Sequence, residues 1–450
     1  MLKKTNIIIS LITATLAVFV TLFSNTISGL MGNHTPSIIR WIALAWFSYL
    51  CWKRKNLTTW ILFSMVIGAE IGLDFPIVAQ ELKIVSKIFL RLIKTIIAPL
   101  IFGTLVVGIA GHANLKQVGR MGWKSLLYFE VVTTIALFIG LLAINISKAG
   151  VGIKLPPVLD SEKLDVPPPS GWQETILHIF PENIAKSIAE GQVLQIVVFS
   201  ILFAIGLAMV KEPHKRNLLN FCESLTEVMF KFTSAIMYFA PFAVGAAIAY
   251  TVGHMGFGIL ANLFNLLATL YIALFAFVLI VLLPIALIIR LPIKKFATAI
   301  IEPVSIAFST TSSEAALPAA LEAMEKIGVP RKIAAFVLPA GYSFNLDGST
   351  LYLSLATVFV AQAAGIDLPI GQQVLILFTL MLTSKGIAGV PRASLVILLG
   401  TATAFGLPVE PIFIILGIDE LMDMARTSIN LVGNCLASCV IARWEGEAEF

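Results

Sequence analysis

The stretch STTSSEAALP, residues 309–318, interrupts an apolar segment that extends from residue 296 to residue 325. A second apolar segment, 370–406, is interrupted in the same way by SKGIAGVP at 384–391. Each broken segment precedes a longer apolar span, at 333–364 and at 409–442. Such pairs are typical of inverted-repeat transporters, whose binding site lies near the bilayer midplane where the broken tips meet. Irregular backbone at that depth needs surrounding protein or a water-filled cavity.

The composition indicates that the whole chain belongs in a membrane. Of 450 residues, 58% are hydrophobic and only 13% are charged. Apolar runs of roughly 20 residues recur, which is the length that a helix needs to cross a bilayer. The predicted fold class is therefore an all-α polytopic membrane protein. The other candidate spans are 7–30, 38–52, 58–75, 88–110, 125–148, 188–210, 228–252 and 257–289.

Charge placement predicts the orientation of the chain. Basic clusters such as Lys53-Arg54-Lys55 fall in loops that a simple zigzag puts on one side, so this side and the N-terminus are predicted to be cytoplasmic. The acidic loop at 149–187 falls on the other side. The net charge of +5 thus reflects topology, and no nucleic-acid partner is expected. No small-residue cleavage site follows the run at 7–30, which predicts an uncleaved first span.

Residues 417–434, GIDELMDMARTSINLVGN, are unusually polar for such a chain. At about 100° per residue, their polar side chains share one helical face. These side chains are Asp419, Asp423, Arg426, Thr427, Asn430 and Asn434. A structural ion pair between Asp423 and Arg426 would explain only two of them. An arginine that binds a carboxylate, beside an aspartate that takes an ammonium, fits an acidic amino acid.

The span at 333–364 is itself interrupted by GYSFNLDGS, residues 341–349. Gly341 frees the backbone, and Ser343, Asn345 and Asp347 offer oxygens, as a partly unwound helix that coordinates a small cation requires. A buried Asp347 is costly unless it holds a cation or a proton. The alternative is a helix kink whose polar groups are satisfied locally.

The two broken tips offer complementary chemistry. Amide N–H groups near Ser312 and Ser313, at the start of a half-helix, can hold a second carboxylate. The tip with Gly386 and Gly389 is small and flexible enough to act as a lid.

Four stretches carry a resemblance to a known family: STTSSEAALP, GYSFNLDGSTLYLSLATVFVAQ, SKGIAGVP and DMARTSINLVGN. They resemble the signature stretches of the dicarboxylate/amino acid:cation symporter family, the glutamate transporter family, and the likeness covers residues 57 to 445 in order. The resemblance implies a homotrimer in a lipid bilayer, with an elevator fold and two re-entrant helical hairpins in inverted repeats. The implied parts are an extra transmembrane hairpin at 1–56, scaffold and first-half helices at 57–290, and a core transport region at 291–450.

The resemblance also implies roles for individual residues. Arg426 would bind the side-chain carboxylate of the substrate and Asp423 its amino group. Asn430 and Ser313 would bind the α-carboxylate, with Thr427 assisting. The remaining implied residues are Gly389 and Val390 in the lid, and Thr133, Thr134, Asn345 and Asp347 around a cation.

The coupling ion is where this chain departs from sodium-driven members of the family. Asn434 stands where they have an aspartate and Ile387 where they have a threonine, which weakens two sodium sites because hard cations need oxygen ligands. The pattern looks most like the bacterial proton-coupled glutamate/aspartate branch in the cytoplasmic (inner) membrane. Glu130, an isolated charge inside the span 125–148, is the preferred proton carrier, with Asp347 and Asp419 as rivals.

The predicted function is therefore proton-coupled import of glutamate or aspartate. The alternatives are sodium coupling and a C4-dicarboxylate substrate. No resident cofactor is expected, and no metal beyond a candidate sodium site at Asn345 and Asp347. A channel would need polar residues along several spans. An intramembrane serine protease would need a base near its serine, and the histidines fall in loops or near span ends, so the chain is not expected to be an enzyme.

Overall fold

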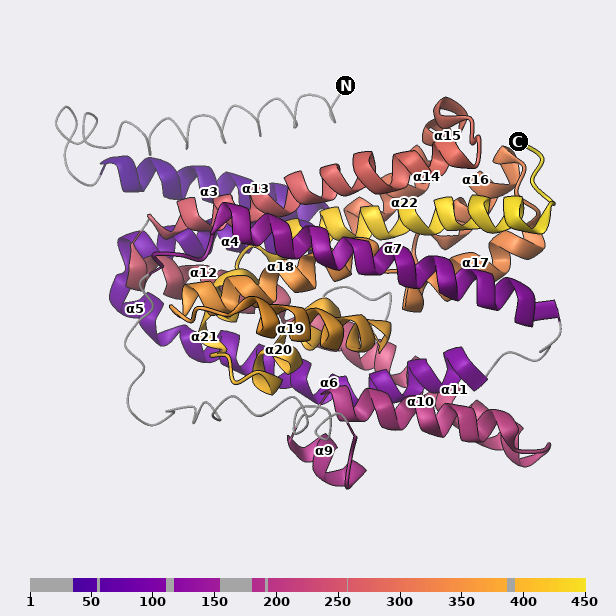
Figure 1. The fold of residues 1–450 in the computed structure, drawn as a ribbon. Coiled ribbons are helices and arrows are strands. Elements are labelled where there is room, and N and C mark those ends of the chain that lie inside the picture. Colours follow the sequence, from indigo (N-terminus) through magenta and orange to yellow (C-terminus); the bar gives the residue numbers. More distant parts are fainter. Residues whose placement is uncertain are drawn as a thin grey trace. The chain divides into compact units, whose positions relative to one another are not determined.

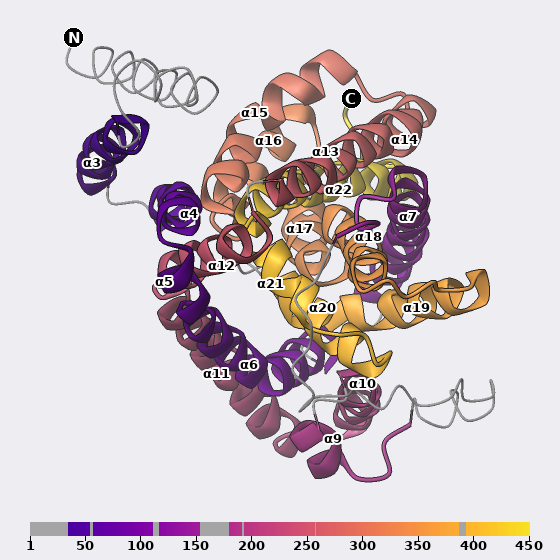
Figure 2. The same cartoon turned by 90° about the vertical axis from the view of Figure 1, so that its left-hand side faces the viewer.

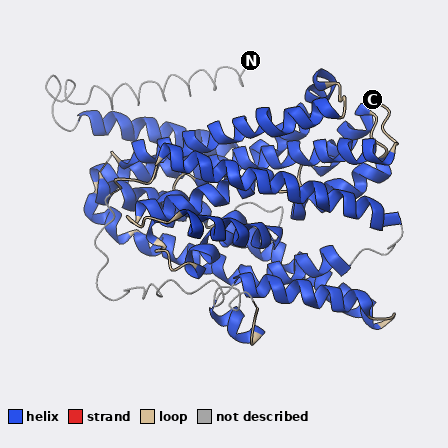
Figure 3. Ribbon diagram, viewed as in Figure 1, coloured by secondary structure: helices blue, strands red, loops and turns tan. Residues whose placement is uncertain are grey.

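The computed structural model describes residues 35–54, 57–110, 117–153, 180–190, 193–256, 258–386 and 393–450. Within these ranges every regular element is helical (Figures 1 and 3). Four of the described helices are long and apolar enough to cross a membrane, or five when α11 and α12 count as one span. The predicted class, an all-α polytopic membrane protein, is confirmed. The first predicted span, 7–30, lies outside the described residues, as does most of the loop at 149–187.

The chain divides into two compact units. The smaller consists of Met1–Ser86 and Tyr238–Phe257, and its described helices are α3 (Thr35–Arg54), α4 (Leu57–Asp74), α5 (Pro76–Glu81), the start of α6 and α12 (Ala240–Met255). In this unit α12 packs along α4, and the backbones meet where a Cβ on Gly68 would collide with the carbonyl of Gly245. The predicted functional boundaries at residues 56 and 290 stay predictions.

A buried ionic network ties α3 to α4 within the smaller unit. Arg40 Nε donates to Glu70 Oε2 at 2.8 Å, and Arg40 Nη2 donates to Asp74 Oδ1 at 3.1 Å. The indole Nε1 of Trp41 donates to the other carboxylate oxygen of Asp74 at 2.8 Å. Only 8% of Arg40 is exposed. The second predicted span, 38–52, thus lies within α3, and its one charged residue, Arg40, is paired with carboxylates of α4.

The larger unit, Lys87–Met237 with Gly258–Phe450, carries the polar residues of interest. Its elements are α6 (Lys83–Ala110, from Lys87), α7 (Gln117–Ser147), α9 (Ile184–Glu190), α10 (Val193–Met209), α11 (His214–Met237), α13 (Ile259–Phe277), the π-helix η1 (Val278–Leu282), α14 (Leu283–Ile288), α15 (Ile293–Thr310), α16 (Leu317–Ile327), α17 (Arg331–Phe344), α18 (Asp347–Ala363), α19 (Ile370–Thr383), the 3-10 helix η2 (Ser384–Gly386), α20 (Ala393–Ala404), α21 (Glu410–Leu416) and α22 (Asp419–Glu445).

Helices α18 and α22 lie side by side at the centre of this unit (Figures 1 and 2). Helices α7 and α13 pack against both of them, and α15 and α17 pack along α22. Every residue of α18 except Gln362 is buried. Helix α18 is therefore a core helix, and its Ser354 and Thr357 hydroxyls donate to carbonyls of the preceding turn.

Two chain breaks bring backbone polar groups into this core. Asn345 and Leu346 separate α17 from α18, and neither has helical dihedral angles. Thr311 ends α15 in the left-handed conformation, at φ +52°, and the turn to α16 follows. Helices α15 and α16 pack against each other as a hairpin. The breaks therefore fall inside the stretches 341–349 and 309–318 that the sequence marked as irregular.

Two spans predicted as single helices are divided. The span 409–442 consists of α21 and α22, with Gly417 and Ile418 between them, and the span 228–252 is divided between α11 and α12. Pro411 and Pro241 stand in the first turn of α21 and of α12. Proline lacks the N–H that would continue a preceding helix, and it is favoured at a new helix start.

Candidate functional site

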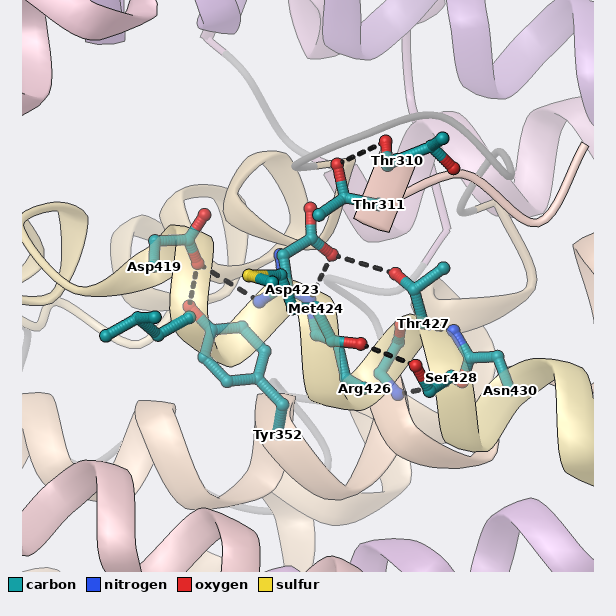
Figure 4. A network of polar contacts seen from close by, with 12 residues as sticks. Thr310, Thr311, Tyr352, Asp419, Asp423, Met424, Arg426, Thr427, Ser428 and Asn430 are labelled. Carbon is teal, nitrogen blue, oxygen red and sulfur yellow. Dashed lines mark hydrogen bonds and ion pairs between the residues drawn. The ribbon is translucent and has the colours of Figure 1, made fainter. Parts of the chain in front are cut away.

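The polar face of α22 forms a buried ionic cluster (Figure 4). Arg426 Nε donates to Asp423 Oδ1 at 2.8 Å, and Arg426 Nη1 donates to Asp419 Oδ1 at 3.1 Å. The side chain of Arg426 has no exposed surface, and those of Asp419 and Asp423 are almost as deeply buried. The spacing of three and seven residues places all three on one face, as the helical periodicity predicted.

Tyr352 of α18 completes this cluster from the neighbouring helix. Its hydroxyl donates to Asp419 Oδ1 at 3.3 Å, and its ring lies under the guanidinium of Arg426, with the central carbon 4.3 Å from the ring centroid. Figure 4 shows the ring beside both side chains. A cation over an aromatic face is stabilised further when both are desolvated. Tyr352 therefore fixes the plane in which Arg426 presents its donors.

The cluster has a spare donor beside two carboxylates. Arg426 Nη2 is buried and has no hydrogen-bond partner among the described residues. Asp419 is the first residue of α22 and Asp423 lies one turn later, where the helix N-terminus favours negative charge. The cluster can thus bind a carboxylate at the free guanidinium nitrogen and a cationic group at the aspartates.

Thr427 and Asn430 continue the polar face toward the centre of α22. Thr427 Oγ1 donates to Asp423 Oδ1 at 3.1 Å. Asn430 Nδ2 donates to Ser349 Oγ at 2.9 Å, and the Ser349 N–H donates to Asn430 Oδ1 at 3.1 Å. Both ends of the Asn430 amide are therefore held by α18, so a substrate carboxylate would have to compete with Ser349 for the amide.

The turn between α15 and α16 holds Ser312 and Ser313. Ser312 is half-buried and Ser313 is buried. The Ser312 hydroxyl accepts the Ala315 N–H at 3.3 Å, and the Ser313 carbonyl accepts the Ala316 N–H at 3.2 Å. The N–H groups of Ala315 and Ala316 are therefore used within the turn. Of the amides predicted to bind a carboxylate, only those before Ala315 remain candidates.

A second polar cluster surrounds the break between α17 and α18. Asn345 Nδ2 donates to Asp347 Oδ2 at 3.3 Å and to Asn434 Oδ1 at 3.1 Å. All three residues are fully buried, and Asn345 Oδ1, Asp347 Oδ1 and Asn434 Nδ2 have no hydrogen-bond partner among the described residues. Two buried oxygens without donors suit a small hard cation or a proton.

Close backbone packing holds this second cluster together. A Cβ on Gly341 would collide with the side-chain amide of Asn434, and a Cβ on Gly433 would collide with the Asp347 carboxylate. Glycine at these two positions therefore lets α17, α18 and α22 approach closely enough for their polar side chains to meet.

Glu130, the preferred proton carrier, is not isolated as the sequence analysis supposed. Its Oε2 lies 3.1 Å from Lys385 Nζ in the short helix η2. The same ammonium donates to Thr133 Oγ1 at 3.0 Å and to the Phe344 carbonyl at 3.2 Å. The ion pair joins residues 255 positions apart in the sequence, so a count of charges within the span 125–148 could not reveal it.

The other predicted residues stand as follows. Thr134 Oγ1 donates to the sulfur of Met381 at 3.5 Å. Ser343 is half-buried near the end of α17. Gly389 and Val390 lie outside the described residues. No group of three or more His, Cys, Asp or Glu side chains able to hold a metal occurs among the residues that the structure describes.

Tyr352, Ser349 and Lys385 were not predicted as members of the site. Tyr352 falls in the apolar run after residue 349, and nothing local distinguishes it from a core residue. Ser349 ends the polar stretch 341–349, but its partner Asn430 lies 81 positions away. Lys385 could have been recognised from the sequence, because it is a lysine inside the otherwise apolar broken segment 370–406. Such a residue marks a functional or ion-paired position by default.

In the described part of the chain, all regular elements are helices, several are broken, and opposite charges and oxygens without a hydrogen-bond donor are buried among them. These features are typical of a secondary membrane transporter. Residues 57–444 match the Sodium:dicarboxylate symporter family. The chain belongs to this family, as the four signature stretches indicated. Its members are symporters, which agrees with the expectation that the chain is not an enzyme.

Three relatives illustrate the range of named activities. The "Proton/sodium-glutamate symport protein" of Geobacillus stearothermophilus is 42% identical over 88% of this chain and 96% of its own length. The "Proton/glutamate-aspartate symporter" of Escherichia coli (strain K12) is 42% identical over 87% and 93%. The "C4-dicarboxylate transport protein" of Bacillus subtilis (strain 168) is 40% identical over 87% and 94%. Identity alone does not separate these substrates.

Proposed function

We propose that this protein imports acidic amino acids, glutamate or aspartate, across the cytoplasmic membrane together with protons. The observation that carries the proposal is the buried Arg426, whose Nη2 has no hydrogen-bond partner among the described residues and lies beside the carboxylate of Asp423. Relatives named as glutamate and glutamate-aspartate symporters support the same substrate class.

The charges of the cluster match those of the substrate. Glutamate and aspartate carry two carboxylates and one ammonium, so a site for them needs a carboxylate binder and an anion close together. Arg426 offers the first and Asp423 the second, and both lie on one face of α22. In this proposal Ser312, Ser313, Thr427 and Asn430 bind the α-carboxylate, and Gly389 and Val390 close the lid.

Electrostatics also supports cation coupling. Glutamate and aspartate each carry a formal charge of −1. Bringing that charge into a low-dielectric interior is unfavourable unless positive charge enters with it. Asp347, Asp419 and Glu130 are the carboxylates that can take up a proton, and Thr133, Thr134, Gly341, Ser343, Asn345 and Asn434 surround the cation position in the proposal.

Two alternative functions, C4-dicarboxylate transport and sodium coupling, differ from this proposal at particular residues. A C4-dicarboxylate has no ammonium, so it would leave the aspartate Asp423 without a partner from the substrate. Sodium coupling would have to do without a carboxylate where the chain has Asn434 and without a hydroxyl where it has Ile387. A relative named "Proton/sodium-glutamate symport protein" keeps sodium open as the second candidate ion. No resident cofactor is part of the proposal.

The proposal includes the assembly and the surroundings. The protein would be a homotrimer in the bacterial inner membrane with a cytoplasmic N-terminus. The core region at 291–450 would move as an elevator, with its two hairpins re-entrant, against a scaffold within 57–290. Exposed apolar side chains on α13, including Phe264, Ile272 and Phe275, support contact with lipid on that helix.

Uptake by the purified protein in liposomes tests the proposal. Labelled glutamate and aspartate are supplied with an inward proton gradient or an inward sodium gradient, each imposed alone. We expect accumulation with the proton gradient alone, and protein-free liposomes are the control. Uptake that requires sodium would refute proton coupling, and transport of succinate without transport of either amino acid would refute the substrate.

A further inference from the structure

Lys385 holds a position that the transport scheme does not yet use. It lies in η2, directly after α19, and its side chain is only 14% exposed. Its ammonium has three oxygen partners, Glu130 Oε2, Thr133 Oγ1 and the Phe344 carbonyl, at 3.0 to 3.2 Å. An ammonium has three N–H donors, so this one is fully coordinated.

The surroundings of that ammonium have the character of a cation site. Phe344 is the last residue of α17, and the carbonyls at a helix C-terminus carry partial negative charge. Asn345 follows it directly, and both Asn345 and Asp347 have a buried oxygen without a donor among the described residues. Oxygens from a hydroxyl, a carbonyl and a carboxylate are the ligands that hard monovalent and divalent cations prefer.

We propose that the Lys385 ammonium takes the place of a bound cation between α7 and the α17–α18 break. Lys385 thereby helps to determine which ion the transporter uses. Its ammonium supplies, from the chain itself, the positive charge that a bound sodium ion would bring to α7 and the α17–α18 break. A cation tethered by its own backbone cannot be carried across and released. This position therefore contributes no sodium dependence. The inference rests on the proposed transport function and adds to it a reason for sodium independence.

A simpler explanation is that Lys385 only clamps η2 to α7. The two explanations differ in what happens when the charge is removed. A lost clamp loosens the structure whatever salt is present. A lost internal cation leaves Glu130, Thr133 and the Phe344 carbonyl able to accept an ion from solution, so sodium restores stability selectively.

The test is thermal unfolding of the purified full-length protein in sodium, potassium or choline chloride at equal ionic strength. We expect the wild type to unfold at nearly the same temperature in all three salts. Lys385→Met should unfold about 2 °C or more higher in sodium than in choline, because ligand binding to the folded state raises the midpoint. Adding Glu130→Gln to Lys385→Met, which removes the carboxylate among the three partners, should abolish this difference.

The control is Lys326→Met, which removes an exposed lysine on α16 and should show no sodium effect. Lys385→Gln, which keeps an amide donor, replaces Lys385→Met if that variant does not fold, and a smaller sodium effect is then expected. Equal unfolding temperatures of the Lys385 variant in sodium and choline would overturn the inference, as would a wild-type sodium effect as large as that of the variant. Failure of glutamate uptake in liposomes would instead remove the proposed function, because the unfolding measurement requires no transport.

Discussion

Replacing Asp423 by asparagine should change the substrate preference of the transporter without dismantling its site. Asp423 Oδ1 accepts hydrogen bonds from Arg426 Nε at 2.8 Å and from Thr427 Oγ1 at 3.1 Å. The amide oxygen of asparagine can accept both. The change therefore removes the negative charge that the substrate ammonium is proposed to meet, while Asp419 still pairs with Arg426.

The size of the effect follows from the loss of one charged hydrogen bond. Such a bond contributes about 1.5–3 kcal/mol, which corresponds to a rise of roughly 10- to 150-fold in the half-saturating concentration of glutamate. Succinate has no ammonium, so this loss does not apply to it. Removing a negative charge beside a dianion favours succinate instead. The ratio of glutamate to succinate transport efficiency should fall at least about tenfold.

The assay is concentration-dependent uptake of labelled glutamate and succinate into liposomes that contain the wild type, Asp423→Asn or Asp367→Asn. Asp367 is exposed in the link between α18 and α19, so its variant controls for the loss of a carboxylate elsewhere. An equal loss of both substrates would refute the reasoning and would mean that Asp423 only positions Arg426. Unchanged glutamate uptake would refute contact between Asp423 and the ammonium.

Two further predictions concern packing around the two polar clusters. Gly433→Ala places a Cβ against the Asp347 carboxylate and should lower the unfolding temperature of the purified protein by several degrees, whereas Gly206→Ala, in open space on α10, should leave it unchanged or slightly higher. Equal unfolding temperatures for the two variants would contradict this account of the close approach. Tyr352→Phe keeps the ring under the guanidinium but removes the hydroxyl bond to Asp419, so we expect glutamate half-saturation to rise about 2- to 10-fold in the liposome assay. A loss of all uptake would mean that the hydroxyl has a further role.

Local periodicity predicted the polar face of α22 correctly, because the positions of Asp419, Asp423 and Arg426 depend only on the geometry of one helix. The break near Asn345 was also predictable, since glycine and short polar residues interrupt an apolar run there. The division of the span 409–442 was missed, because a single glycine followed by an isoleucine is a weak stop signal inside an apolar segment.

Contacts between distant elements could not be predicted in the same way. Asn430 and Ser349 meet 81 positions apart, and Glu130 and Lys385 meet 255 apart. No pattern within either segment specifies such a partner, because the pairing depends on how whole helices pack. The interpretation of Glu130 as an isolated charge was wrong for this reason.

The ionic network of Arg40 has a consequence for the order in which the chain enters the bilayer. An unpaired arginine at the centre of a membrane helix raises the free energy of insertion by about 2.5–3.5 kcal/mol, and by less near the membrane surface. The carboxylates that hold Arg40 belong to Glu70 and Asp74, which leave the ribosome 30 and 34 residues later. Helix α3 can therefore form these ion pairs only after α4 has emerged, so the two helices reach their packed arrangement as one unit.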